Sequence, residues 1–256
     1  MTYYDEKILP TGPLTEEEAC ATILKERKIL SKRIEKENNR EYAYRVLRDN
    51  IMTLQLLPGT TINEGELAEL FHTSRTPIHE AVLMLKEEYL VDVYPQSGSK
   101  ISRIQLDILK EGYFLRSLIE PELIAHMAGN ISSGQAAELR ENLDRQKAAL
   151  HQKDKIDTFF KLDDSFHHLL YQMAGKPRTW YAVKKVSTHY DRIRYLDAIM
   201  YHTELKNIYE EHKKIFQILL LGMAPDFEWK NFYDRHLGTY RKGFSEIFEK
   251  YPEYFA

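Results

Sequence analysis

The stretch "NEGELAELFHTSRTPIHEAVLMLKEEYLV", residues 63–91, decides the fold. Asn63 and Ser74 each precede an apolar run, where a side-chain oxygen can cap the first N–H groups of a helix. Glu66, three residues after Asn63, makes a variant of the capping box, and Pro77 falls in a first turn, where its missing N–H costs nothing. The runs have helical spacing and comprise Leu67, Leu70 and Phe71, then Ile78, Ala81, Val82 and Leu85. The sequence therefore predicts two helices joined by a tight turn.

The flanking residues extend this unit to about residues 41–104. Before it, an apolar stripe predicts a helix from Glu41, which ends at the turn of residues 57–60. After it, residues 90–94 and 100–104 are short β-prone runs on either side of a turn at 95–99. Helix, short helix, helix and hairpin together are typical of a winged helix-turn-helix, whose second helix enters a DNA major groove.

The residues from 105 onward contain long amphipathic runs and no convincing strand pairs. The predicted fold is mainly α, with an N-terminal winged helix-turn-helix and a C-terminal all-α helical bundle. The expected organisation is a helical extension at 1–40, a winged helix-turn-helix domain at 41–104, an all-helical domain at 105–248 and a tail at 249–256.

Composition restricts the cell compartment and the class of partner. The chain has 256 residues with 36 Lys and Arg against 39 Asp and Glu, so a uniformly basic nucleic-acid-binding surface is excluded. Cys20 is the sole cysteine, and no stretch resembles a signal peptide or a membrane span. We expect a cytoplasmic protein with no membrane partner.

Charge is unevenly distributed between the first two segments. Residues 25–40 hold seven basic and three acidic side chains, whereas residues 41–104 hold six basic and nine acidic ones. A negatively charged DNA-binding domain is a poor match for phosphate. We therefore hypothesise that the basic segment helps to hold phosphates, or that recognition depends heavily on Arg75. A solvated helix face remains the plainer interpretation of the segment.

The run "LPGTTINEGELAELFHTSRTPIHEAVLMLKEEYLVDVYPQSGSKISRI", residues 57–104, resembles the winged helix-turn-helix of GntR-type bacterial transcription regulators. Farther along, "LRSLIEPELIAHMA", "LDDSFHHLLYQMAG", "RIRYL" and "EEHKKIFQILLLG" resemble the FCD ligand-sensing domain of the FadR subfamily. The resemblance implies a homodimeric transcription regulator, most simply a repressor, that binds double-stranded operator DNA and responds to a small organic acid.

The resemblance also implies which residues contact DNA. Base and phosphate contacts are expected from Ser74, Arg75, Thr76 and His79 of the recognition helix and from Ser97 and Gly98 at the wing tip. Two positions depart from the family pattern. His79 replaces a second recognition-helix arginine, and Gly65 replaces an arginine that some members carry before the "ELAE" motif.

Asp163 and His167 are four residues apart in a helical run, so their side chains leave one helix face and can share a metal ion. The FCD resemblance adds His212 and His236 to this ligand set. Three imidazoles and one carboxylate suit Zn²⁺ or Ni²⁺, and Mn²⁺ or Fe²⁺ less well.

The resemblance implies that Arg116 and Arg192 bind an anionic effector, although Arg116 could instead pair with Glu120 one turn away. The second half has no nucleophile motif or phosphate loop, so we expect no enzyme activity. A metal-dependent enzyme fused to a DNA-binding module, and a regulator with a purely structural metal, remain the alternatives.

Overall fold

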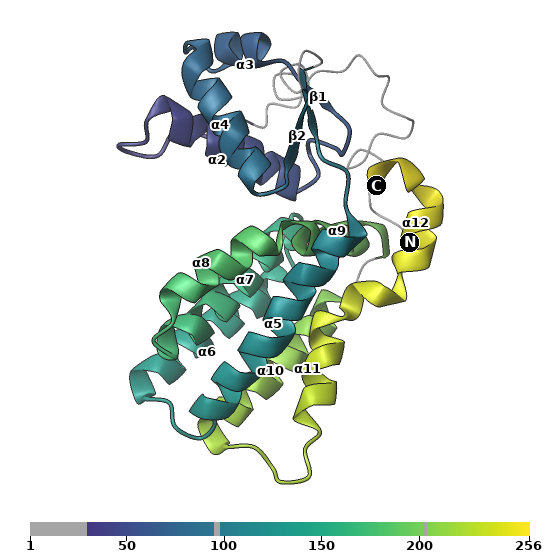
Figure 1. Cartoon of the computed structure of the whole chain (residues 1–256). Helices are drawn as coiled ribbons and strands as arrows, with labels where there is room; N and C mark the ends of the chain where they lie inside the picture. Colours follow the sequence, from purple (N-terminus) through teal and green to yellow (C-terminus); the bar gives the residue numbers. More distant parts are fainter. Residues whose placement is uncertain (1–29, 95–97, 202–203) are drawn as a thin grey trace. The chain divides into compact units, whose positions relative to one another are not determined.

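A computed structural model of the protein describes residues 30–94, 98–201 and 204–256. They divide into two compact units, shown in Figure 1. The first contains the described residues up to Leu106 together with Tyr251–Ala256, and the second contains Asp107–Lys250. The fold class is confirmed as mainly α, with a small antiparallel sheet in the first unit and helices throughout the second.

The elements of the first unit are α2 (Asn39–Met52), β1 (Thr61–Ile62), α3 (Glu64–Leu70), α4 (Arg75–Glu87), β2 (Val91–Tyr94) and β3 (Gly98–Ile101). The side chain of Asn63 caps α3 by accepting from the N–H groups of Gly65 and Glu66, at 3.0 and 3.3 Å. Ser74 is the N-cap of α4 but makes no side-chain capping bond. The strand order is β1-β3-β2, so β1 adds a third strand to the predicted hairpin.

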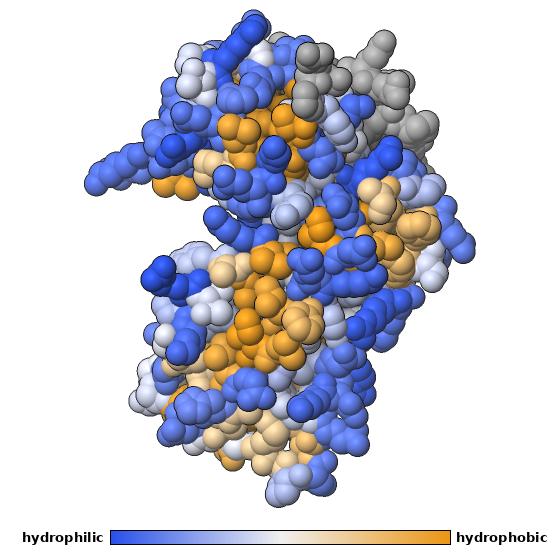
Figure 2. All heavy atoms as spheres, in the orientation of Figure 1, coloured by the Kyte–Doolittle hydropathy of each residue, from blue (hydrophilic) through white to orange (hydrophobic). Residues whose placement is uncertain are grey.

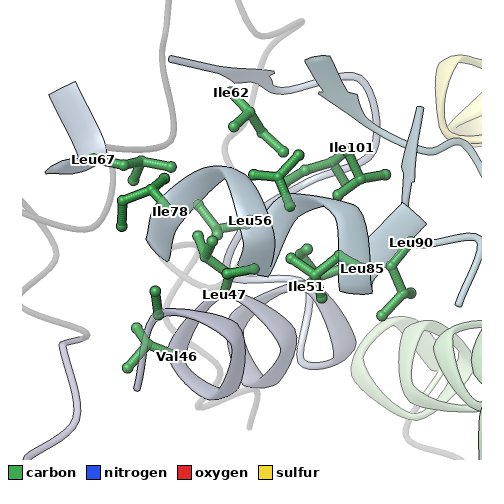
Figure 3. Packing of buried hydrophobic residues seen from close by; sticks show 14 of the residues in the cluster. Val46, Leu47, Ile51, Leu56, Ile62, Leu67, Ile78, Leu85, Leu90 and Ile101 are labelled. Atoms are coloured by element: carbon green, nitrogen blue, oxygen red, sulfur yellow. The ribbon is translucent and has the colours of Figure 1, made fainter. Parts of the chain in front are cut away.

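The apolar stripes of α2, α3 and α4 meet in one core beneath the sheet, which Figure 3 shows from close by. In α4 the buried residues are Ile78, Ala81, Val82 and Leu85, the stripe predicted from the sequence. Because one side of α4 is committed to this core, its other side is left for solvent or a partner.

The C-terminal residues fold back onto the first unit. Phe255 forms a parallel β-bridge with Ile104, whose N–H donates to the carbonyl of Tyr254 at 2.7 Å. Tyr254 and Phe255 are buried. The two chain segments that lead into and out of the second unit are therefore hydrogen-bonded to each other.

The helical extension expected over residues 1–40 lies mostly outside the described residues. Its described part, residues 30–38, is not helical, because Arg45 of α2 holds it in an irregular conformation. The Arg45 guanidinium donates to Glu37 at 2.7 Å, to the Ser31 hydroxyl at 2.7 Å and to the Lys32 carbonyl at 3.0 Å. One of these bonds satisfies a backbone carbonyl, and the other two tie the side chains of Glu37 and Ser31 to α2.

The second unit consists of α5 (Leu106–Met127, of which Leu106 belongs to the first unit), α6 (Ser133–Ala149), α7 (Lys155–Met173), α8 (Pro177–Val186), α9 (Thr188–Tyr201), α10 (Leu205–Leu221), α11 (Trp229–Leu237), the 3₁₀ turn η1 (Thr239–Lys242) and α12 (Phe244–Lys250). A second 3₁₀ turn, η2 (Pro252–Tyr254), belongs to the first unit. The predicted breaks near Gly129, Gly175 and Pro225 separate helices. Among the described helices, none is long and apolar enough to cross a membrane.

Several described non-glycine residues of the first unit adopt the left-handed conformation, among them His72, with φ of 52°, and Tyr89, with φ of 57°. This conformation costs an L-residue roughly 1–2 kcal/mol relative to glycine.

We predict that Tyr89→Gly raises the free energy of unfolding by about 0.5–1 kcal/mol, the strain relief less the entropy that glycine gains when unfolded. Urea unfolding followed by circular dichroism measures the change. Tyr94→Gly is the control, because Tyr94 is an exposed tyrosine in strand β2 and its loss should destabilise the protein. A lower urea midpoint for Tyr89→Gly would contradict the prediction.

Candidate functional site

The exposed face of α4 carries the recognition-helix residues proposed for DNA contact. Ser74, Arg75, Thr76 and His79 are all exposed. Gly98 is also exposed, and its φ of 87° favours glycine at the start of β3. Ser97 lies outside the described residues. The fold thus gives α4 one polar surface of the kind that a recognition helix requires.

Arg75 lies over the start of α3. A Cβ atom at Gly65 would be 3.1 Å from Nη2 of Arg75, closer than ordinary van der Waals contact. Gly65 therefore leaves space for the Arg75 guanidinium, so one arginine occupies the region where some relatives carry two.

His79 is held by a carboxylate that the sequence analysis did not single out. Nδ1 of His79 lies 3.0 Å from Oε1 and 3.2 Å from Oε2 of Glu64, the first residue of α3. The His79 side chain is 54% exposed, so its outer edge remains accessible. The pair adds an acidic group to the face that would meet DNA.

Other arginines of this unit are paired with acidic residues. Arg45 contacts Glu37 at 2.7 Å, and Arg48 contacts the buried Glu88 at 2.8 Å. The charges of Arg45 and Arg48 are thus neutralised locally, whereas Arg75 is exposed at the start of α4.

The second unit brings three predicted metal ligands together. His167 of α7, His212 of α10 and His236 of α11 are buried, and each offers a ring nitrogen within 4.8 Å of the other two. Nε2 of His236 is 3.4 Å from Nε2 of His167. Two nitrogens bound tetrahedrally to one Zn²⁺ at about 2.1 Å are themselves about 3.4 Å apart, so this spacing fits a shared ion.

Asp163 stands beside this cluster. Its Oδ1 is 3.5 Å from Nε2 of His212 and 4.0 Å from Nε2 of His167. Within the described part of the chain, the buried Nε2 of His212 has no hydrogen-bond partner. A divalent cation would supply the missing partner, and the four predicted ligands are therefore a chemically suitable donor set.

Two of the three imidazoles have a hydrogen-bond acceptor at Nδ1, the nitrogen that faces away from the cluster. Nδ1 of His212 lies 2.8 Å from Oε1 of Gln146, and Nδ1 of His236 lies 2.8 Å from Oε2 of Glu211. For these two histidines the outer acceptors hold the proton on Nδ1 and direct the Nε2 lone pair inward, as is usual for histidines that bind metals. Nδ1 of His167 lies 3.0 Å from Oε2 of Glu120, but the geometry of this contact is not that of a hydrogen bond.

Gln146 is itself fixed. Its amide nitrogen donates to Oδ1 of Asn142 at 2.7 Å, and the Asn142 amide donates to the carbonyl of Leu162 at 3.1 Å. The Gln146 oxygen must then face His212, which makes Nδ1 of His212 the donor.

Burial sets the protonation states of the cluster. It lowers the pKa of His212 well below the usual value and also lowers the pKa of His167 despite the nearby Glu120 carboxylate. Burial alone would raise the pKa of Asp163, but the Arg194 guanidinium and the neighbouring imidazoles hold it well below its usual range. Neutral imidazoles and an ionised carboxylate are the forms that bind metal ions.

Two buried arginines adjoin the cluster. Arg194 meets Asp163 with both terminal nitrogens, at 3.1 and 3.2 Å. Arg116 donates to Glu120 at 2.8 Å, the ion pair considered as its alternative role. Both guanidinium carbons lie 5.5 Å from the centre of the Tyr190 ring. Arg192 is also fully buried. Arg192 was named as a candidate effector residue, and the arginine of the same helix that reaches Asp163 is Arg194.

A pocket of 840 Å³ opens next to this cluster within the second unit. Its walls include Glu211, Phe232 and Arg241. Because Glu211 also contacts His236 at 2.8 Å, the pocket lies one side chain away from a predicted metal ligand.

Family models match both units. Residues 39–101 match "Bacterial regulatory proteins, gntR family", and residues 111–224 match "FCD domain". The HTH-type transcriptional repressor RspR of Escherichia coli K12 is 34% identical over 176 residues, which cover 69% of this chain and 76% of RspR. The chain belongs to the GntR family and carries an FCD domain.

Further relatives agree with this assignment of a DNA-binding transcription regulator. An HTH-type transcriptional regulator of Streptomyces ambofaciens is 33% identical over 188 residues, covering 73% of this chain and 78% of that protein. The solved structure of E. coli McbR/YncC shares the fold with a TM-score of 0.64 and 19% identity, covering 84% of this chain and 99% of McbR/YncC. These matches are to transcription regulators, not to enzymes.

We predict that Gln146→Leu weakens Zn²⁺ binding about 10-fold to 100-fold, because His212 loses the acceptor that orients it. Competition against a chromophoric chelator measures the affinity. Gln172→Leu is the matched control, since Gln172 is an exposed glutamine on α7. Equal Zn²⁺ affinities for the two variants would show that the Gln146 contact does not organise the site.

Proposed function

We propose that the protein represses transcription as a homodimer on a near-palindromic operator, and that a small carboxylate metabolite bound beside a divalent cation alters this binding. The observation that carries the proposal is the position of Asp163, whose carboxylate faces both Arg194 and the three-histidine cluster. One carboxylate therefore belongs to a cation-binding group and to a candidate anion-binding group.

Asp163, His167, His212 and His236 would hold the cation, with Zn²⁺ or Ni²⁺ favoured over Mn²⁺ or Fe²⁺. The ion supplies a Lewis acid to which an effector carboxylate can bind. Arg194 offers a planar fork that fits a carboxylate in two-point fashion. Because that fork now holds Asp163, an effector carboxylate and Asp163 compete for the same donors, and metal and effector binding become linked.

Arg116 and Arg192 are the other cationic candidates for the effector site. Both are buried, and Arg116 shares the Tyr190 ring with Arg194. Because Arg116 is paired with Glu120, a small dicarboxylate or hydroxycarboxylate that reached it would have to compete with that side chain for the guanidinium.

DNA binding is assigned to α4 and the wing. Arg75 would contact a guanine, Ser74 and Thr76 would contact phosphate or base edges, and Gly98 would allow close approach at the wing tip together with Ser97. Repression, rather than activation, is supported by the E. coli relative that is named a repressor.

Dimerisation is assigned to the exposed face of α5. Phe114 and Leu118 lie one helical turn apart and are 58% and 53% exposed. Other residues of α5, among them Ile124 and Met127, are buried in the core of the second unit. Figure 2 shows apolar surface gathered over this helix. A helix that is apolar on both sides requires a second cover. A second copy of the chain fits, because a two-fold operator needs two recognition helices.

The effector proposal is tested on operator DNA selected from a random library, with binding followed by fluorescence anisotropy during a screen of small carboxylates. We predict that one of them changes the operator Kd at least about 5-fold in Zn²⁺-loaded protein and less than about 2-fold after chelation. Arg194→Lys should lose the response because it lacks the fork, whereas the exposed Arg178→Lys on α8 should keep it.

The other outcomes identify the alternatives. A response that survives chelation, in protein that unfolds more easily without metal, indicates a purely structural ion. Consumption of the carboxylate would indicate an enzyme. Activation of a reporter placed downstream of the operator would contradict the proposed role as a repressor.

We predict that Leu118→Glu dissociates the dimer at micromolar concentration. Each Leu118 is 53% exposed, so its loss from both copies removes about 2 kcal/mol of burial, roughly 30-fold in the dimer Kd, and burying two carboxylates instead costs several kcal/mol more. Sedimentation velocity measures the state, and Leu221→Glu is the control, because Leu221 is 83% exposed at the end of α10. A monomeric wild-type protein would refute the dimer, and a dimeric Leu118→Glu variant would refute this face.

A further inference from the structure

His79 occupies the centre of the exposed face of α4. It lies one turn after Arg75 and Thr76 and is exposed like them, whereas the neighbouring Ile78 and Val82 are buried. At this spacing the three polar side chains leave the same helix face. If α4 enters the major groove, as the proposed function requires, His79 meets base edges together with Arg75.

Glu64 determines which hydrogen-bonding group His79 presents. Its carboxylate lies 3.0 and 3.2 Å from Nδ1 of His79. A carboxylate only accepts hydrogen bonds, so the proton of the neutral imidazole resides on Nδ1. Nε2, at the outer edge of the half-exposed ring, is then an acceptor.

The major groove offers few groups that match this acceptor. Adenine presents its N6 amino group and cytosine its N4 amino group, whereas guanine O6 and N7 and thymine O4 only accept. An arginine at this position would seek guanine instead. We propose that His79, positioned by Glu64, reads an adenine or cytosine amino group at the operator position where relatives with arginine read guanine.

Arg75 provides an internal reference for this reading. Its guanidinium lies over Gly65, 3.1 Å from where a Cβ would stand, and is not held by Glu64, which faces His79. Its bidentate preference for guanine should not depend on the state of His79. Each half-site therefore contains one base expected to respond to changes at His79 and one expected to stay guanine.

The test is selection of operator sequences from a random duplex library by the full-length dimer at pH 8, where an ordinary imidazole is neutral. Wild-type protein should prefer adenine or cytosine at one position of each half-site by about 3-fold to 10-fold, the value of one hydrogen bond. His79→Arg should change that position to guanine, while the guanine assigned to Arg75 is retained.

Glu64→Gln tests the positioning role. An amide can donate to Nδ1 as well as accept from it, so Nε2 is no longer restricted to accepting, and the preference should fall below about 2-fold. Glu80→Gln is the matched control, because it removes the same charge from an exposed position next to His79 and should leave the preference intact.

Three results would overturn the proposal. Wild-type protein could select guanine, thymine or no base at the position that His79→Arg changes, no position could change with His79→Arg, or Glu64→Gln could retain the full preference. Failure of every variant to select any sequence would instead refute the assignment of α4 as the DNA-reading helix.

Discussion

The packing of the helices in the second unit depends on how its buried charges are balanced. Removing an ionised side chain from water costs several kcal/mol unless opposite charges and hydrogen bonds offset it. Glu120 is fully buried and accepts from Arg116 and from the hydroxyl of Tyr233, and it also faces His167. Asp163 is balanced by Arg194. These partners come from α5, α7, α9 and α11, so balancing the two carboxylates constrains how these four helices pack.

This arrangement explains how a helical bundle can respond to a small anion. Two carboxylates, Glu120 and Asp163, satisfy two arginines that stack on the same tyrosine. Every buried charge has an assigned partner in this group, so an added charged ligand must exchange one partner for another. Replacing an ion-pair partner between two packed helices favours one packing arrangement of those helices over another. The change occurs in discrete steps, because a close-packed interior does not deform continuously.

The sequence predicted correctly the features that depend on the regular spacing of residues within one helix. The buried stripe of α4 follows from helical spacing, and the pair Asp163 and His167 follows from the same spacing. Contacts between distant segments could not be predicted. Gln146 lies 66 residues from the histidine that it orients. Arg192 and Arg194 lie two residues apart on one helix and point in different directions, so only the packing of α9 distinguishes them. The two-residue strand β1 is too short to leave a pattern.

The electrostatics of the first unit lead to a different balance of forces on DNA from that of a strongly basic domain. Arg45 and Arg48 are engaged by acidic side chains, and Glu64 adds negative charge to the reading face. Non-specific affinity comes almost entirely from neutralised phosphates. The engagement of Arg45 and Arg48 by acidic side chains lowers this term, whereas hydrogen bonds to bases are unaffected by the net charge. A domain built this way gives up affinity for arbitrary DNA and gains a larger ratio of specific to non-specific binding, provided that dimerisation doubles the base contacts.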